Sequence, residues 1–294
     1  MAGARAETPS SGLPQHVAVN DGTRAKTTAS ARDSVLGDLP CLVMGSGPPL
    51  ALLGGLTPEN GLPVGLARWL EVQTMTPFAQ HFEVFWVARR RGLAKGTTMA
   101  DMAADVADAL AARFDEPVDV LGISTGGSIA QQLAADHPAA VRRLALVSTA
   151  CRLENTGRRF QQEMAALARE GARREVFTRF ARDLVPPRRG RAAAGAAMAW
   201  LGPRLYPHAG DLGDLAVTLE AEDAFDLREL APIQAPTLIV GGGEDRFYPQ
   251  SLFAETARLI PNATLAIYPR RGHITVLSDP EAQAVIIEFL RTGR

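Results

Sequence analysis

Residues 118–127 read Val-Asp-Val-Leu-Gly-Ile-Ser-Thr-Gly-Gly and carry the clearest structural signal in the sequence. A β-branched run ends in the pattern G-x-S-x-G at residues 122–126, and an Ala-rich run to residue 136 follows. This order predicts a strand, a sharp turn and a helix. The turn strains the backbone of Ser124, and the flanking glycines let the chain approach closely. We therefore expect the Ser124 hydroxyl at the carboxyl edge of a sheet, where ligands of open α/β sheets bind.

Short apolar runs alternate with helical patterns on both sides of this stretch. Residues 99–114 repeat apolar side chains four positions apart, which is typical of a helix that buries one stripe. Residues 280–291 repeat that pattern. The apolar runs that we expect to form strands cover residues 50–53, 84–88, 118–121, 144–147, 237–240 and 264–268. Strands that alternate with helices predict an α/β fold with a doubly wound, mostly parallel central sheet.

Residues 150–231 break this alternation. They contain several helical stretches rich in Ala and Arg, an interruption at Pro186-Pro187 and no convincing strand. We therefore expect a helical cap inserted after the strand at 144–147, with the α/β core formed by residues 34–149 and 232–294.

Residues 1–33 are rich in Ala, Ser, Thr, Gly and charge and have no apolar periodicity. This composition predicts a disordered leader, with a mitochondrial-type presequence as the alternative.

The composition of the 294 residues is that of a globular protein, with 46% hydrophobic and 21% charged residues. A net charge of −1 gives no electrostatic reason to expect nucleic acid as a partner. No apolar run approaches the roughly 20 residues that cross a bilayer, so no membrane span is expected. Cys41 and Cys151 allow at most one disulfide, and such sparse usage favours a reducing, cytoplasmic location. The sequence does not distinguish a monomer from a homodimer.

A serine hydroxyl needs a neighbouring base, usually an imidazole held by a third group, before it acts as a nucleophile. Of the five histidines, His273 follows the last predicted strand by a short loop and therefore lies at a carboxyl edge. Asp245 follows the strand at 237–240 and opens at the same edge, with Glu244 as a rival acid. The sequence thus predicts a catalytic set of Ser124, His273 and Asp245.

Stabilising the tetrahedral intermediate of such a reaction requires two backbone N–H donors. Thr125 supplies one, because it follows the serine at a helix N-terminus. The other is expected from the loop Gly54-Gly55-Leu56 after an earlier strand, with the Leu56 N–H as donor.

The order Ser124, Asp245, His273, with the Gly-rich turn and the loop after an earlier strand, resembles the α/β-hydrolase family. The resemblance covers about residues 34–294 and implies a core domain with a cap over the pocket. Two departures stand out. The usual His-Gly of the oxyanion loop is Gly54-Gly55 here, and the Asp often found after the next strand is replaced by Ala-Arg-Arg-Arg at residues 88–91. Whatever ion pair fixes that region in the family must therefore differ in this chain.

A serine nucleophile that attacks a carbonyl gives an acyl-enzyme, which water then hydrolyses. This predicts a hydrolase that cleaves a carboxylic ester, lactone or thioester. The short oxyanion loop resembles that of family members that act on esters of primary and secondary alcohols, and this resemblance implies such esters as substrates. We see no cluster with metal-ligand spacing and expect neither a metal nor a cofactor.

The aromatic residues of the predicted cap indicate an apolar pocket for a small to medium molecule. Phe177, Trp200 and Tyr206, with Thr57 from the oxyanion loop, are the candidate substrate-binding residues, although the three aromatics could equally form the cap's own core. Three other functions stay open. They are a cofactor-free perhydrolase or haloperoxidase, a carbon–carbon bond hydrolase with the same triad, and a ligand-binding receptor without turnover.

Overall fold

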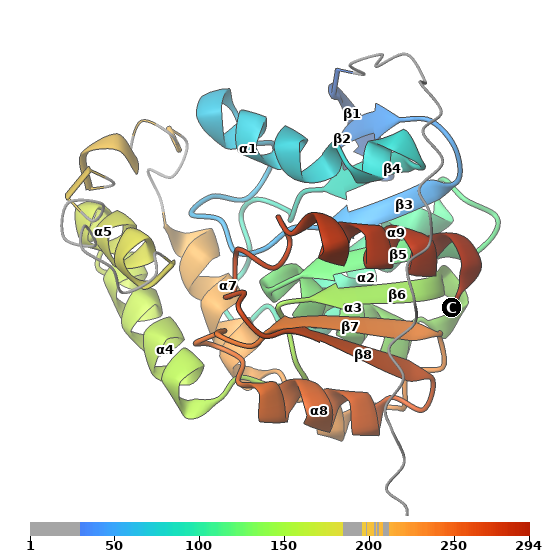
Figure 1. Ribbon diagram of the computed structural model, residues 1–294. Helices are drawn as coiled ribbons and strands as arrows, with labels where there is room; N and C mark the ends of the chain where they lie inside the picture. The colour runs from blue at the N-terminus through green and yellow to red at the C-terminus, as the bar shows by residue number, and fades with distance from the viewer. Residues whose placement is uncertain (1–29, 185–195, 198, 203, 205, 208–211) are drawn as a thin grey trace, which may run out of the picture.

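The computed structural model describes residues 30–184, 196–197, 199–202, 204, 206–207 and 212–294 (Figure 1). Its centre is an eight-stranded sheet with the order β1-β2-β4-β3-β5-β6-β7-β8. β1 and β2 pair antiparallel and β2 runs antiparallel to β4, whereas β3 to β8 are all parallel. The strands are β1 (Arg32–Leu36), β2 (Leu39–Gly45), β3 (Pro49–Leu53), β4 (Glu83–Val87), β5 (Val118–Ile123), β6 (Val141–Val147), β7 (Thr237–Gly242) and β8 (Ala263–Tyr268). The predicted α/β fold with a mostly parallel sheet is confirmed.

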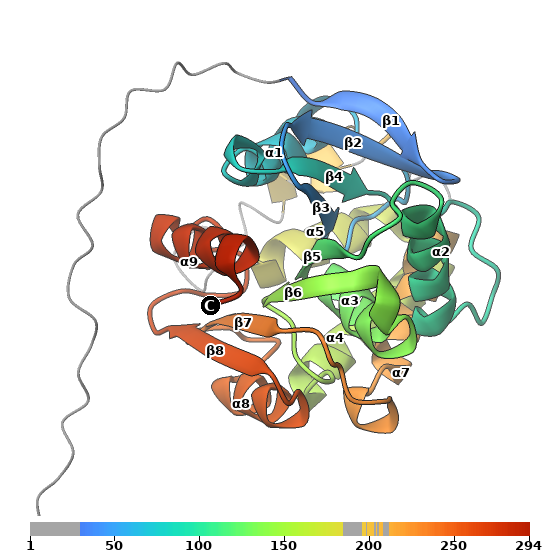
Figure 2. The ribbon, with the colours of Figure 1, turned by 90° about the vertical axis from the view of Figure 1, so that its right-hand side faces the viewer.

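Helices cover both faces of the sheet (Figures 1 and 2). One face packs against α1 and α9, and the other against α2, α3 and α8. β3 shows why the strands are apolar throughout: Leu50 and Leu52 pack on the first face, while Ala51 and Leu53 pack on the second. The helices outside the insertion are α1 (Gly65–Met75), α2 (Met99–Ala111), α3 (Thr125–Asp136), α8 (Gln250–Leu259) and α9 (Pro280–Thr292).

The antiparallel edge of the sheet begins within the predicted leader. Arg32 and Asp33, which we expected to belong to it, instead start β1 and pair with β2. The turn between these two strands contains Gly37 at φ +54°, a conformation that glycine adopts without steric cost. Leu36 is fully buried, so burial on the core holds this end of the chain in the sheet. Residues 1–29 of the predicted leader lie outside the described residues.

A helical segment separates β6 from β7, so a helical insertion follows the strand predicted at 144–147. It contains α4 (Asn155–Arg169), α5 (Arg173–Leu184) and α7 (Gly213–Ala224). Phe160, Met164 and Leu219 belong to a buried apolar cluster shared by these helices. In the described part of this segment, the only strand-like pairing is an isolated bridge near its two ends. The segment therefore packs mainly on itself and on one end of the sheet.

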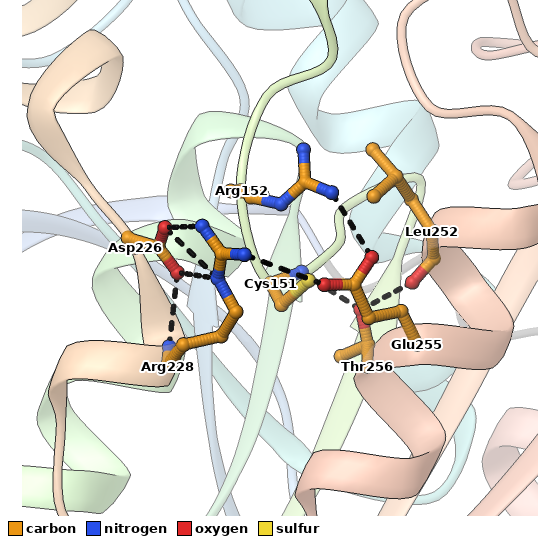
Figure 3. A network of polar contacts seen from close by, with 7 residues as sticks. All are labelled: Cys151, Arg152, Asp226, Arg228, Leu252, Glu255 and Thr256. Atoms are coloured by element: carbon orange, nitrogen blue, oxygen red, sulfur yellow. Dashed lines mark hydrogen bonds and ion pairs between the residues drawn. The ribbon is translucent and has the colours of Figure 1, made fainter.

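Both ends of the insertion are anchored on α8 (Figure 3). The Cys151 N–H donates to Thr256 Oγ1 at 2.7 Å. Arg152 pairs with Glu255 at 3.1 Å, and Arg228 approaches the same carboxylate at 4.0 Å. Partly exposed ion pairs contribute little individually to stability, so the buried hydrogen bond from Cys151 to Thr256 contributes more to this anchoring. These contacts fix the base of the insertion beside the carboxyl end of the sheet.

Candidate active site

Ser124 lies in the turn that joins β5 to α3, as the sequence predicts. Its φ of +51° is one of two positive values among the described non-glycine residues, and such strained residues cluster at functional sites. A Cβ at Gly126 would lie 2.1 Å from the Leu53 carbonyl oxygen, and one at Gly122 would lie 2.7 Å from Ala130 Cβ. Only glycine fits at either position, so the two flanking glycines make the turn possible.

The structure brings Ser124, His273 and Asp245 together in one hydrogen-bonded chain. Ser124 Oγ lies 3.0 Å from His273 Nε2, and His273 Nδ1 lies 2.9 Å from Asp245 Oδ2. The Asp245 side chain is fully buried, while that of His273 is 15% exposed. A carboxylate only accepts hydrogen bonds, so Nδ1 carries the hydrogen and Nε2 is left to accept from Ser124. This is the geometry in which an imidazole removes a proton from a hydroxyl.

Contacts from neighbouring loops hold the acid and the imidazole in place. Asp245 Oδ1 accepts from the N–H groups of Phe247 and Tyr248 at 2.8 and 3.1 Å. The Phe247 ring meets the His273 ring edge-on at a centroid distance of 4.9 Å. Ser148, the other non-glycine residue at positive φ, donates its hydroxyl to the His273 carbonyl at 2.6 Å. The imidazole is therefore restrained through its ring and its backbone.

The two predicted N–H donors lie beside the serine. Leu56, Thr125 and Ser124 line one cavity, and a Cβ at Gly55 would lie 3.6 Å from Ser124 Cβ. Among the described residues, neither the Leu56 nor the Thr125 N–H has a hydrogen-bond acceptor. Unsatisfied donors beside a serine are suited to an oxyanion that forms only during reaction.

Arg89 holds the loop that carries Leu56. Its guanidinium donates to the carbonyls of Gly54 and Gly55 at 3.4 and 3.1 Å, to Thr57 Oγ1 at 2.7 Å and to Asn60 Oδ1 at 3.0 Å. Arg89 belongs to the stretch of arginines that replaces the Asp often found at this place in the family, where we expected the ion pair to differ. In this chain the planar guanidinium of Arg89 holds the loop by donating hydrogen bonds to its oxygen atoms.

Burial lowers the pKa of Arg89 to about 10, although the charges of Glu222, Glu71 and Asp214 oppose this shift. The side chain therefore stays cationic at neutral pH. Thr57 donates its hydroxyl to the Glu59 carbonyl at 2.8 Å and accepts a hydrogen bond from Arg89. Its side chain therefore stabilises the conformation of the loop.

Replacing Arg89 with methionine is expected to lower kcat by on the order of 10²-fold, because the loop carbonyls lose their donors and the Leu56 N–H shifts from the oxyanion position. Arg89→Lys should restore only part of the rate, since an ammonium lacks the planar fork. Steady-state kinetics on one ester measure the effect. The matched control is Arg90→Met, which removes a 48% exposed side chain. Unchanged kcat in folded Arg89→Met would contradict this role.

Glu222 of α7 joins the insertion to the start of α3. It is 1% exposed and accepts from Thr125 Oγ1 at 2.7 Å, Ser128 Oγ at 3.0 Å and Gln161 Nε2 at 2.7 Å. The Tyr248 hydroxyl donates to it at 3.3 Å, and burial with the Glu222 charge raises the pKa of Tyr248 well above its usual range. The phenol therefore stays neutral and remains a donor. Sequence reasoning missed this cluster, because its members are far apart in the chain: Thr125 and Glu222 alone are separated by 97 residues.

Ser124 and His273 open into a cavity of about 250 Å³. Most of its wall is apolar or aromatic, as in typical small-molecule sites. The insertion contributes Phe160 and Phe180, and the loop after Asp245 contributes Phe247. Apart from the catalytic set, the oxyanion loop and Thr125, the remaining described lining residues are Glu71, Thr74, Ile123, Leu153, Gln161, Tyr248, Ile274 and Leu277.

The four candidate substrate-binding residues lie outside this lining. Phe177 is fully buried and stacks on Tyr206 at a centroid distance of 5.8 Å. Trp200 is 62% exposed, with the Arg204 guanidinium over its ring at 4.2 Å. Phe177 and Tyr206 thus pack within the insertion, which is the alternative that the sequence left open for the cap aromatics.

Neither a metal centre nor a membrane-spanning helix occurs in the described part of the chain. No group of three or more His, Cys, Asp or Glu side chains is arranged to hold an ion there. Similarly, no described helix combines the length and apolarity needed to cross a bilayer.

Residues 35–285 match the model of the alpha/beta hydrolase family. The chain belongs to this family and is a hydrolase. It is 32% identical over 261 residues to the pimeloyl-[acyl-carrier protein] methyl ester esterase of Chromobacterium violaceum, covering 85% of this chain and 96% of that protein.

Solved structures show the same fold. The enol-lactonase from Burkholderia xenovorans superposes with a TM-score of 0.68 at 20% identity, over 88% of this chain and 100% of that one. A thermophilic esterase from Thermogutta terrifontis gives a TM-score of 0.66 at 21% identity, over 90% of this chain and 98% of the other.

Proposed function

We propose that this hydrolase is a serine esterase in which Ser124 is the nucleophile, His273 the general base and Asp245 the group that orients the imidazole. The observation that carries the proposal is the 3.0 Å contact between Ser124 Oγ and His273 Nε2. In the first step His273 takes the hydroxyl proton as Oγ attacks the ester carbonyl. The Leu56 and Thr125 N–H groups stabilise the negative oxygen that forms.

Collapse of this intermediate breaks the bond to the alcohol, which leaves with the proton from His273 Nε2. Water then attacks the acyl-enzyme, His273 takes a proton from that water, and the acid departs as Ser124 regains its hydrogen. Protein groups and water complete both halves of the cycle, so the reaction needs no metal or cofactor.

We propose esters of small primary alcohols with a largely apolar acyl chain as substrates. The aromatic walls of the cavity support an apolar acyl group. The relative from Chromobacterium violaceum is named as a methyl ester esterase, and this supports a small alcohol. Residues 150–231 act as the cap in this proposal, since they supply Phe160 and Phe180 to the wall. The free, buried cysteines fit a cytoplasmic enzyme.

A matched panel of esters tests this assignment. We expect hydrolysis of methyl and p-nitrophenyl alkanoates, with kcat/KM rising as the acyl chain lengthens from acetate and then falling once the cavity is filled. The tert-butyl ester of the best acid should react on the order of 10²-fold more slowly, because its branched alcohol crowds the oxyanion loop. Peroxide-dependent halogenation faster than ester hydrolysis, or folded protein that hydrolyses no ester, would contradict the proposal.

A further inference from the structure

Helix α1 places one carboxylate in the wall of the catalytic cavity. Glu71 and Thr74 are the α1 residues in the lining, whereas Ala67 and Met75 of the same helix are buried. Among the described lining residues, Glu71 is the only acid. It belongs to none of the roles assigned above, so its presence in a largely apolar wall requires another explanation.

One oxygen of the Glu71 carboxylate is held by a hydrogen bond, and the other has no partner in the part of the chain that the structure describes. Trp86 Nε1 donates to Glu71 Oε2 at 2.9 Å. The indole itself is held against the oxyanion loop, since a Cβ at Gly54 would lie 2.9 Å from Trp86 Nε1. Trp86 is 5% exposed, so it provides a rigid support. Glu71 Oε1 has no hydrogen-bond partner in the described part of the chain.

The charge of Glu71 is only partly compensated. Burial raises its pKa above the usual range, while the Trp86 hydrogen bond and the Arg89 charge pull it down. No cation lies within ion-pair distance of Glu71 among the described residues, and the Arg89 guanidinium is directed to the oxyanion loop. A carboxylate in an apolar wall is costly unless a partner arrives. A ligand that brings a positive charge would offset this cost.

We propose that Glu71 is a specificity-determining residue that binds a protonated amine on the substrate, so the preferred esters carry an ammonium group at the end of an otherwise apolar acyl chain. This inference rests on the proposed esterase function. The free oxygen accepts the ammonium hydrogen bond while Trp86 holds the other oxygen still. A substrate with a carboxylate at the same place meets like charge and is rejected.

Three p-nitrophenyl esters of equal acyl length test the proposal: an ω-aminoalkanoate, an alkanoate and an ω-carboxyalkanoate. In the wild type we expect kcat/KM for the amino ester to exceed that for the carboxy ester by on the order of 10²-fold. Glu71→Gln should reduce this ratio about tenfold or more, mainly through KM, and should raise kcat/KM for the carboxy ester. The charge-matched control is Glu288→Gln on α9, where the side chain is 60% exposed.

A purely structural role for Glu71 would lower the rates on all three esters together and leave their ratio unchanged, which would overturn the proposal. Binding separates this outcome from failure of the esterase assignment. Calorimetric titration of Ser124→Ala with an n-alkylammonium ion should give weaker binding when Glu71→Gln is added, whether or not any ester is hydrolysed. Equal binding by the two proteins would refute the role of Glu71 even if ester hydrolysis is observed.

Discussion

Replacing Ser124 with alanine is expected to lower kcat for ester hydrolysis by on the order of 10³-fold or more. Without the hydroxyl no acyl-enzyme forms, and the cavity retains only substrate binding and the two N–H donors. The fold should persist, because the Ser124 side chain contacts His273 and provides no helix-capping hydrogen bond. Initial rates on the best ester of the panel, together with circular dichroism, give the measurement.

Ser278→Ala is the matched control for this change. Ser278 lies in the segment between His273 and α9, and its hydroxyl donates to the Thr275 carbonyl at 3.4 Å. We expect near wild-type kcat in this variant. Ser124→Ala that keeps most of the activity would show that another group attacks the ester.

His273→Ala is the second substitution with a large expected effect, also on the order of 10³-fold in kcat. Without the imidazole, no group within 3.0 Å of Ser124 Oγ accepts its proton in the described structure. His137→Ala, at the end of the helix that begins after Ser124, is the matched control.

The double variant sharpens this prediction. Residues that act as one unit have non-additive effects, so Ser124→Ala with His273→Ala should cost about as much as either change alone. If the two losses in kcat were additive, or if His273→Ala kept the wild-type kcat, the imidazole and the serine would not act as one catalytic unit.

The position of Ser124 could be predicted because its determinants are local. A β-branched run, two glycines and an Ala-rich run are adjacent in the sequence, and together they form a strand, a tight turn and a helix. Asp245 and His273 could be placed because parallel strands gather their carboxyl ends at one edge. The contact between their side chains also requires β7 and β8 to be neighbours in the sheet, an order that the alternating pattern does not predict.

The antiparallel edge was not predicted, because its signals are weak. β2 contains Pro40 and ends at Gly45, and both residue types are rare inside strands. β1 is mostly exposed and is held by its pairing with β2. Tertiary pairing therefore outweighs local preference in this part of the sheet.

The residues that line the cavity could not be predicted from the sequence either, because they depend on which face each helix presents to the cavity. Phe160 and Phe177 both lie in Arg-containing helices of the insertion. Phe160 lines the cavity, whereas Phe177 packs against Tyr206. Glu71 and Glu222 reach the site only through contacts with distant elements. Long-range packing of this kind leaves no periodic signal in the sequence.

Covalent labelling with a fluorophosphonate tests most directly whether Ser124 is an activated nucleophile. The reagent reacts with a serine whose hydroxyl is deprotonated by a neighbouring base. Intact-protein mass spectrometry of the folded wild type should show a single adduct, peptide mapping should place it on Ser124, and Ser124→Ala should remain unlabelled. Folded wild-type protein that gains no adduct, or Ser124→Ala that is labelled as fast as the wild type, would contradict the account.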